Sequence, residues 1–423
     1  MARNDHSRGP RPLADAAWLN AKPLRAVFAL FDDAGREVRV VGGSVRNTLI
    51  GHPVTDIDLA TPVLPGEVMR LAKAAGMHAH PTGIDHGTVT IVAAGHPFEV
   101  TTLRRDIETD GRRAVVAFTT DWAEDAERRD FTINAIYALP DGSLYDPTGG
   151  LDDLKARRVR FIGNAEDRIR EDYLRILRFF RFSAAYGEGP LDAAGLSASG
   201  ALKAGIGSLS GERIGAEMLK LLAAPGAAAV TATMQSTSIL TEVLGRDGDA
   251  PAFARLCAIE QELARPADLI ARLAALALSG ASGGAAAAQS LAQRLRLSNE
   301  EASRLSAANS PNAAFDPATP LASAKEALYR IGADRWASAG LVAWARAGAD
   351  PRDSNRRTRL ELPQSWTVPV LPVRGADVLA LGVPAGPDVG KIVKAFEEWW
   401  IAAGFPSDPA VQQSKLRALA KLG

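Results

Sequence analysis

Two aspartates one residue apart, Asp56 and Asp58, are the residues whose type and spacing point most directly to chemistry. They lie in TDIDLAT, whose branched residues are typical of a strand. Side chains alternate between the two faces of a strand, so both carboxylates point the same way while Ile57 points to the core. Carboxylates this close repel each other unless a cation is present, and hard oxygen ligands beside a substrate phosphate suit Mg²⁺. We predict a catalytic metal pair; the alternative is an exposed polar strand edge.

A third carboxylate, Glu99, stands in FEVTTLR, which we expect to form a neighbouring strand. If it converges with the aspartate pair, the three can hold two metal ions. One ion would activate an attacking hydroxyl and the other would stabilise a leaving pyrophosphate. We predict Glu99 as catalytic, the alternative being an ordinary exposed strand glutamate.

A pair of glycines, Gly42 and Gly43, ends the apolar run before SVRNTLIG, which reads as a short helix. Glycines allow a ligand to approach the backbone, and the N–H groups at a helix start face an anion. Arg46, in the first turn, could add a charged fork to a phosphate. We predict nucleotide binding at this turn; an ordinary strand–helix turn is the alternative.

The segment RRDFTINAIYAL supplies two more candidates for nucleotide binding. Arg129 could hold a triphosphate, and Asp130 could accept a hydrogen bond from a ribose hydroxyl. The alternative is a helix start that Asp130 caps, with the arginines in solvent.

The segment EDYLRILRFFRF places Asp172, Arg175 and Arg178 three residues apart, with Arg181 following at the same spacing. On one helix these side chains share a face. An Asp acceptor beside an Arg donor matches the Watson–Crick edges of cytosine and adenine. Uracil and guanine present the reverse order and would leave buried polar groups unpaired, at about 1–3 kcal/mol each. We predict a base-selecting helix; an ion-paired surface helix is the alternative.

The elements that must position these groups change in kind along the chain. From Val38 to about Asp146, short runs rich in branched and aromatic residues alternate with helical runs. These runs are VRVVGG, DIDLAT, TVTIVA, FEVTTLR, AVVAF and AIYAL. After about Leu151, Ala, Leu, Arg and Glu recur at helical spacing. We therefore predict an α+β fold in which a small sheet-containing head precedes a long helical part.

At 423 residues the chain is too long for one domain of typical size, about 100–200 residues. We predict a flexible N-terminal tail (1–21), a catalytic head (22–150), a helical neck with the nucleotide-selecting helix (151–225), a helical body (226–350), and a linker with a helical tail (351–423). The stretch near Ser279 is expected to be a loop, and the Pro-rich stretch from Pro351 a linker.

Bulk composition limits the partners and the compartment. Lys plus Arg and Asp plus Glu both total 49, so any nucleic-acid surface must be a local patch. Cys257 is the only cysteine, which excludes an internal disulfide and fits a reducing cytoplasm. The polar N-terminus indicates no signal peptide, and the most apolar stretch, from Leu269, is interrupted by Arg272. We expect a cytoplasmic protein with no membrane partner and no obligatory protein partner.

Five segments together resemble motifs of the bacterial and eukaryotic CCA tRNA nucleotidyltransferase/poly(A) polymerase family, within the polymerase-β-like nucleotidyltransferases. They are GGSVRNTLIG…TDID, RRDFTINA, YDPTGGLDDLKARRVRFIG, EDYLRILRFFRF and GERIGAEMLKLL, and they span Val38 to Leu222. The resemblance implies a head with a mixed sheet, followed by an all-α neck, body and tail. It implies template-independent addition of C, C and A to tRNA from CTP and ATP, with Mg²⁺ and release of pyrophosphate.

The resemblance also implies roles for individual residues. Asp56 and Asp58 would hold Mg²⁺. The residues that would contact the incoming nucleotide are Gly43, Arg46, Arg129, Asp172, Arg175, Arg178 and Arg181. The segment Arg105–Phe118 corresponds to a flexible loop that helps the change from C to A addition. The basic cluster Arg356, Arg357 and Arg359 is a candidate contact to the tRNA backbone or else a solvated linker.

One residue departs from the family pattern, because Asn47 stands where the family usually has Asp. An asparagine can serve if that residue orients Arg46 by a hydrogen bond that tolerates a neutral partner. Within the same chemistry, a poly(A) polymerase or an enzyme adding only CC or only A remains open. A non-catalytic RNA-binding scaffold is the alternative of a different class. The six histidines all precede residue 97, so we expect no His/Asp phosphohydrolase activity in the helical part.

Overall fold

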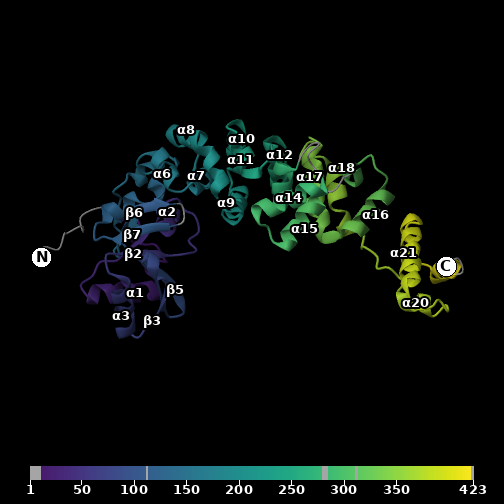
Figure 1. The fold of residues 1–423 in the computed structure, drawn as a ribbon, viewed down its shortest axis with the longest axis horizontal. Helices are drawn as coiled ribbons and strands as arrows, with labels where there is room; N and C mark the ends of the chain where they lie inside the picture. Colours follow the sequence, from purple (N-terminus) through teal and green to yellow (C-terminus); the bar gives the residue numbers. More distant parts are fainter. Residues whose placement is uncertain (1–10, 111–112, 279–283, 310–312, 421–423) are drawn as a thin grey trace. The chain divides into compact units, whose positions relative to one another are not determined.

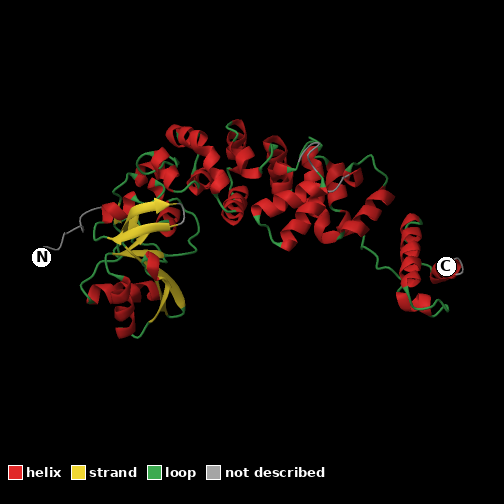
Figure 2. Ribbon diagram, in the orientation of Figure 1, coloured by secondary structure: helices red, strands yellow, loops and turns green. Residues whose placement is uncertain are grey.

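The structure is a computed structural model that describes residues 11–110, 113–278, 284–309 and 313–420. The chain divides into two compact units, Met1–Gly245 and Arg246–Gly423, and each is described by itself. All the described strands belong to the first unit, whereas the described part of the second unit is helical (Figures 1 and 2). The α+β prediction is therefore confirmed, with the change in kind after β9 (Leu144–Tyr145).

The first unit is built on a seven-stranded sheet with the order β3-β4-β5-β2-β1-β8-β9. The other bounds are β1 Arg39–Val41, β2 Asp58–Thr61, β3 His78–Gly83, β4 Thr88–Ala93, β5 His96–Thr102 and β8 Tyr137–Ala138. β2 and β5 run parallel, and every other neighbouring pair is antiparallel. This is the mixed sheet that the family resemblance implied, and the parallel pair lies at its centre.

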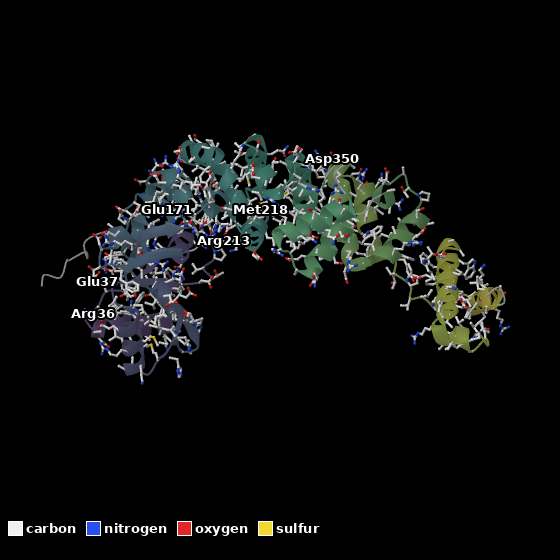
Figure 3. All side chains as sticks on the ribbon, viewed as in Figure 1. Arg36, Glu37, Glu171, Arg213, Met218 and Asp350 are labelled. Carbon is white, nitrogen blue, oxygen red and sulfur yellow. The ribbon has the colours of Figure 1, made fainter. Side chains whose placement is uncertain are left out.

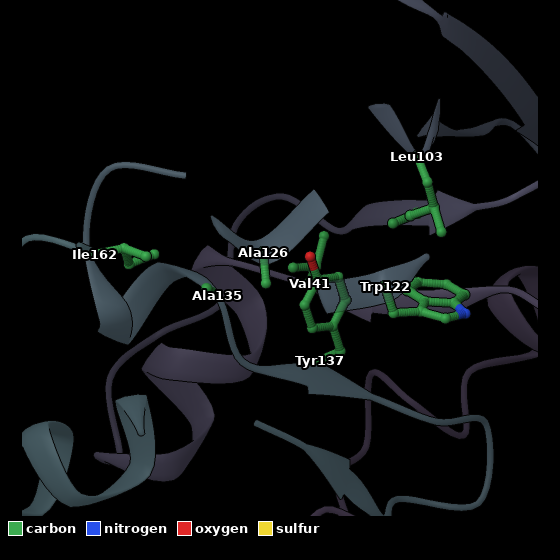
Figure 4. Close-up of a cluster of buried hydrophobic side chains, with 8 residues drawn as sticks. Val41, Leu103, Trp122, Ala126, Ala135, Tyr137 and Ile162 are labelled. Atoms are coloured by element: carbon green, nitrogen blue, oxygen red, sulfur yellow. The ribbon is translucent and has the colours of Figure 1, made fainter. Parts of the chain in front are cut away.

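Four helices accompany the sheet: α1 (Lys22–Asp33), α2 (Gly43–Leu49), α3 (Pro65–Ala74) and α4 (Trp122–Glu127). α1 buries Leu24, Val27, Phe28 and Phe31 at helical spacing, so one apolar stripe of this helix faces the core. A second cluster joins β1 and β8 to α4, where the rings of Trp122 and Tyr137 meet edge-on at 5.5 Å (Figure 4). These contacts fix the strand ends at which the predicted site residues lie.

Two sequence-based expectations in the head require correction. β2 begins at Asp58, so Asp56 precedes the strand instead of lying in it. The segment expected to be a flexible loop forms a separate antiparallel hairpin, β6 (Arg104–Asp110) with β7 (Arg113–Phe118). Its ladder of backbone hydrogen bonds, which a sequence scan does not see, makes it regular on both sides of residues 111–112, which lie outside the described residues.

The N-terminal segment is also more ordered than expected. Leu13 and Leu19 are buried, and the backbone N–H of Leu13 donates to the carbonyl of Gly142 at 3.3 Å. For residues 11–21 the expectation of a flexible tail is therefore wrong, because two leucines bury their side chains against the head.

The helices that complete the first unit follow the sheet in sequence. They are α5 (Gly150–Lys155), α6 (Ala165–Glu171), α7 (Leu174–Tyr186), α8 (Ala193–Leu202), α9 (Gly211–Ala223), α10 (Ala227–Ser236) and α11 (Ile239–Leu244). α7 carries the predicted selecting arginines on one side and buries Ile176, Phe179 and Phe180 on the other. α9 packs along α7, which becomes important for the site below.

The second unit contains α12 (Ala250–Glu262), α13 (Leu269–Ala277), α14 (Ala285–Leu295), α15 (Asn299–Ala308), α16 (Leu321–Ile331), α17 (Ala333–Arg346), α18 (Ser354–Leu360), α19 (Leu362–Ser365), α20 (Gly375–Leu379), α21 (Pro387–Ala402) and α22 (Pro409–Ala420). One core surrounds Trp336, and another surrounds Phe396 and Trp400. The Pro-rich stretch from Pro351 contains α18 and α19, so its expectation as a linker is wrong up to Ser365. The loop expected near Ser279 falls on residues 279–283, outside the described residues. No described helix is long and apolar enough to cross a bilayer.

Candidate active site

The three predicted carboxylates come from adjacent strands at one edge of the sheet. The parallel ladder places Asp58 of β2 directly beside Glu99 of β5, and Asp56 lies two residues before Asp58. Burial raises the pKa of Asp58, and the charges of Glu99 and Asp56 raise it further, whereas Arg129 opposes them. Mutual repulsion of this kind is what a bound cation would relieve.

The carboxylates fit a divalent ion only in part. Two carboxylates combined with substrate phosphates are a usual Mg²⁺ ligand set, and Asp56 and Asp58 supply it. Among the residues that the structure describes, however, no group of three or more His, Cys, Asp or Glu side chains is gathered closely enough to hold a metal ion. The convergence of Glu99 with the aspartates into one three-carboxylate site is thus not assembled in this structure.

The glycine turn has a backbone that requires glycine. Gly42 has a φ of 81°, in the region that residues with a Cβ atom rarely adopt, and α2 begins immediately after it. A Cβ added at Gly43 would lie 3.8 Å from a guanidinium nitrogen of Arg46. The turn and Arg46 are therefore adjacent, as the sequence suggested.

The Arg46 side chain is directed inward, and this differs from the expected charged fork. Its guanidinium donates to Asn134 Oδ1, to Tyr186 Oη at 2.7 Å, and to Asn47 Oδ1 from Nε (3.2 Å) and Nη2 (2.9 Å). It also lies over the Tyr186 ring, 3.9 Å from the centroid. Burial lowers the pKa of Arg46. Three neutral side chains thus hold a buried cation beside the glycine turn.

Asn47 also contacts the chain that leads to the aspartates. Its Nδ2 donates to the carbonyl oxygen of Pro53 at 2.9 Å. A carboxylate could not make this bond, because it has no N–H to donate. Asn47 therefore links Arg46 to the loop that precedes Asp56.

Arg129 is held by a buried acid and a phenol. Its Nη2 lies 3.1 Å from Asp125 Oδ2, and its Nε donates to Tyr137 Oη at 3.2 Å. Asp125 also accepts from Arg128 (2.8 Å) and from the Tyr137 hydroxyl (2.7 Å). Burial alone would raise the pKa of Asp125, but Arg129 and Arg128 outweigh it and lower the pKa to about 2. This network fixes Arg129 within electrostatic reach of Asp58.

Asp130 has its oxygens occupied by protein groups. Arg178 of α7 donates to Oδ2 from Nε (2.8 Å) and Nη2 (2.5 Å), and Oδ1 accepts from Asn134 Nδ2 and the Phe131 N–H, both at 2.9 Å. Arg178 is the main cause that holds the pKa of Asp130 below its ordinary value despite burial. The expected ribose contact would require part of this arrangement to open.

Asp172 does not lie on a helix, so the expectation of one continuous helical face is wrong at its first residue. Asp172 has an extended backbone (φ −157°, ψ 107°) between α6 and α7, and its Oδ1 accepts from the Leu174 N–H at 3.1 Å. Its Oδ2 accepts from Arg213 Nη2 of α9 at 2.6 Å (Figure 3 labels Arg213). Asp172 acts as a capping residue for α7, and a distant arginine holds its second oxygen.

The remaining arginines of α7 each meet a carboxylate. Arg175 contacts Glu171 and donates to the carbonyl of Arg168 at 2.8 Å, so it is directed away from Asp172. Arg181 Nε lies 2.5 Å from Glu217 of α9. The predicted Asp172/Arg175 donor–acceptor pair is therefore not assembled here.

Sequence reasoning missed Asp125, Tyr186, Arg213 and Glu217 as parts of this network. For the two α9 residues a signal existed, since Arg213 and Glu217 stand four apart in GERIGAEM and thus on one helix face. Each of them meets a residue of the selecting segment. For Asp125 and Tyr186 we find no such signal.

The basic cluster of the second unit has protein partners. Arg356 lies 3.7 Å from Asp353, Arg357 lies 3.0 Å from Glu361, and Arg359 donates to the carbonyl of Thr319. These contacts favour a structural role for α18 over a free phosphate-binding patch.

Known proteins resemble this chain over most of its length. Residues 38–160 match the family model described as the poly A polymerase head domain. The mitochondrial CCA tRNA nucleotidyltransferase 1 of Mus musculus is 32% identical over 394 residues, which cover 90% of this chain and 87% of that protein. The CCA-adding enzyme of Oceanobacillus iheyensis is 46% identical over 206 residues, covering 48% of this chain and 50% of that enzyme. The crystal structure of the Bacillus stearothermophilus CCA-adding enzyme in complex with CTP superimposes with a TM-score of 0.74 at 27% identity, covering 98% of this chain and 100% of that one.

Proposed function

The chain belongs to the CCA tRNA nucleotidyltransferase family, and from this premise we propose that its site adds C, C and A to the 3′ end of tRNA from CTP and ATP without a template. The chain is an enzyme, a nucleotidyltransferase whose partners are tRNA and the two nucleotides.

One chain of contacts carries the assignment of this activity to the described residues. The ion pair between Asp130 and Arg178 brings the selecting helix α7 against the segment that contains Arg129. The charge of Arg129 in turn acts on Asp58 at the carboxylate edge. Base selection and phosphoryl transfer would therefore take place within one unit of the protein.

The reaction forms a bond between the 3′ oxygen of the tRNA and the α-phosphorus of the nucleotide. The bond from that phosphorus to the bridging oxygen of pyrophosphate breaks, pyrophosphate leaves, and the hydroxyl proton is released to water. We assign Asp56 and Asp58 to a divalent ion, with Glu99 beside them. Such an ion would neutralise charge on the attacking and leaving oxygens.

We propose that Mg²⁺ is this ion, because two carboxylates and a triphosphate give the oxygen ligands it prefers. The Gly42–Gly43 turn would lie beside the triphosphate, since it offers backbone N–H groups without a Cβ atom. Arg46 and Arg129 would contribute positive charge from their fixed positions. The single, half-buried Cys257 is consistent with a cytoplasmic location, which we also propose.

Base selection would fall to Asp172 and the arginines of α7. Asp172 already holds its carboxylate at a fixed place through Leu174 and Arg213. Arg175 would have to leave Glu171 to stand beside Asp172 as a donor. Arg178 and Arg181 would complete the contacts to the nucleotide from the same face of the helix.

A poly(A) polymerase is the second candidate, because the matching head model carries that description. The test is to offer purified protein, Mg²⁺ and a tRNA transcript trimmed by three nucleotides each nucleotide singly and then all four together. We expect termination at CCA with no U or G. A ragged A tail would instead identify a poly(A) polymerase, and a stop at CC a partial enzyme. Asp56→Ala is the matched control, which should bind tRNA but incorporate nothing.

A further inference from the structure

A cavity of about 670 Å³ opens beside the carboxylates, and none of the residues assigned to the incoming nucleotide lines it. Asp56, Asp58 and Glu99 form part of its wall. The volume falls within the range of small-molecule sites and accommodates one nucleoside. The carboxylates thus border a second space, distinct from the side where Gly43, Arg129 and α7 lie.

The walls of this cavity are apolar away from the carboxylates. The segment before α1 contributes Trp18, and the start of α1 contributes Pro23 and Leu24. Ile57 and Phe98 come from the two strands that carry the acids. The Trp18 indole is half-buried, and its Nε1–H donates to Thr48 Oγ1 at 2.8 Å, which fixes the ring. Aromatic and aliphatic walls of this kind suit the faces of a nucleobase.

The charge of the cavity excludes a triphosphate. Among the described residues that line it there is no lysine or arginine, and its ionisable groups are three carboxylates and His96. An anion with several charges would meet repulsion here, whereas an uncharged nucleoside would not. A nucleoside whose ribose faces the carboxylates would also place its 3′ hydroxyl where the reaction needs it.

We propose that this cavity holds the nucleoside at the 3′ end of the tRNA being extended. The base rests against the apolar walls from the N-terminal segment, α1 and β5, and the ribose lies toward Asp58 and Glu99. The backbone phosphates of the acceptor strand remain outside, in solvent. This inference rests on the proposed function, and it gives the segment before α1 a part in substrate binding.

The first test fills the cavity with side chains of increasing size. Ala21, half-buried and extended at the cavity wall, is replaced in Ala21→Leu and Ala21→Trp. Ala29→Trp, at an exposed position of α1 outside the cavity, is the matched control. We expect KM for trimmed tRNA to rise with side-chain size, by about tenfold or more for Ala21→Trp, which corresponds to about 1.4 kcal/mol. CTP binding without tRNA should stay unchanged, and thermal unfolding of each variant reports whether it is folded.

The second test places 4-thiouridine at the last position of the tRNA and crosslinks the complex with wild-type protein. We expect crosslinks to residues 18–24 or 96–98. Crosslinks only to α2 or α7, unchanged KM values in both Ala21 variants, or a loss of CTP binding would each overturn the proposal. If wild-type protein adds no nucleotide at all, the proposed function fails. The crosslink then still reports where the tRNA end lies, so the two failures are distinguishable.

Discussion

The side-chain oxygen of Asn47 accepts two hydrogen bonds from the guanidinium of Arg46, and the amide nitrogen of Asn47 donates to the carbonyl of Pro53. The first contact is one that an aspartate could also make. The second is one that it could not, because a carboxylate facing a carbonyl oxygen has no proton to share. The neutral residue at this position therefore has a use of its own in this chain.

This relationship predicts unequal effects of two substitutions at Asn47. Asn47→Asp keeps the contact to Arg46 but frees the loop before Asp56, so we expect kcat to fall by no more than about tenfold. Asn47→Ala loses both contacts around a buried cation, and we expect a loss of about 1–3 kcal/mol in the free energy of unfolding and a larger fall in kcat. Steady-state kinetics and urea unfolding measure both. An Asn47→Ala protein that matched wild type would show that this residue organises nothing.

The carboxylate edge predicts a stability change that depends on metal. Burial and the neighbouring acids raise the pKa of Asp58, so ionising it opposes folding of the metal-free protein at neutral pH. Its contribution is most favourable below the ordinary carboxyl pKa and is lost as pH rises through the raised value. We expect Asp58→Asn to unfold at a higher temperature than wild type in EDTA at pH 7. Mg²⁺ should raise the unfolding temperature of wild type but not of Asp58→Asn. Equal responses to Mg²⁺ in the two proteins would remove Asp58 from the metal site.

The contact between Arg213 and Asp172 predicts graded losses of base selection. Asp172→Ala should incorporate U and G more readily relative to C and A, by about tenfold or more, because the acceptor is gone. Arg213→Met should lose less, since the Leu174 N–H still holds one oxygen of Asp172. Arg213→Lys should restore part of the loss. Competition assays with all four nucleotides give these ratios, and unfolding curves control for folding. Wild-type selectivity in Asp172→Ala would contradict the assignment.

The Asp125 network predicts sensitivity to acid. The folded-state pKa of about 2 lies below the ordinary value of 3.8, so the ionised group favours folding above pH 4. The shift corresponds to about 2 kcal/mol, of which about half would be lost near pH 3. Asp125→Asn should be less stable at pH 7 by about 3–5 kcal/mol, because it leaves two buried arginines without their acid. Its stability should also vary less between pH 5 and 3 than that of wild type, which urea unfolding at the two pH values checks.

The turn between β4 and β5 predicts a stabilising substitution. Ala94 and Gly95 both have positive φ, 48° and 80°, in a two-residue hairpin loop. Turns of this kind favour Asn-Gly, and an alanine in the left-handed region is strained by about 1 kcal/mol. Ala94→Asn should therefore raise the free energy of unfolding by about this amount without changing activity. A destabilised protein would show that the strain is offset by contacts that alanine alone permits.

The sequence predicted the elements whose pattern is local. TDIDLAT and FEVTTLR alternate branched residues, and both became central strands that bring Asp58 beside Glu99. β3 was missed because HAHPTG lacks this alternation and contains a proline, which is tolerated on an edge strand.

Other features depended on partners distant in sequence. The break at Asp172 contains no proline or glycine, and one of the contacts that hold it comes from Arg213, 41 residues away. Arg46 is directed inward by Asn134 and Tyr186, which are 88 and 140 residues away. Such tertiary contacts override local propensity, and one sequence without an alignment does not reveal them.

The parallel register of β2 and β5 links correct folding to activity. Side chains alternate along a strand, so slipping β5 by a single residue would place an aliphatic side chain beside Asp58 and send Glu99 to the opposite face. A molecule with that error would lose its acid and expose or bury the wrong groups together. It would be inert instead of careless, because the defect that disturbs the strand also removes the chemistry. For an enzyme whose products are read in every round of translation, a fold that fails silently protects the tRNA pool from faulty ends.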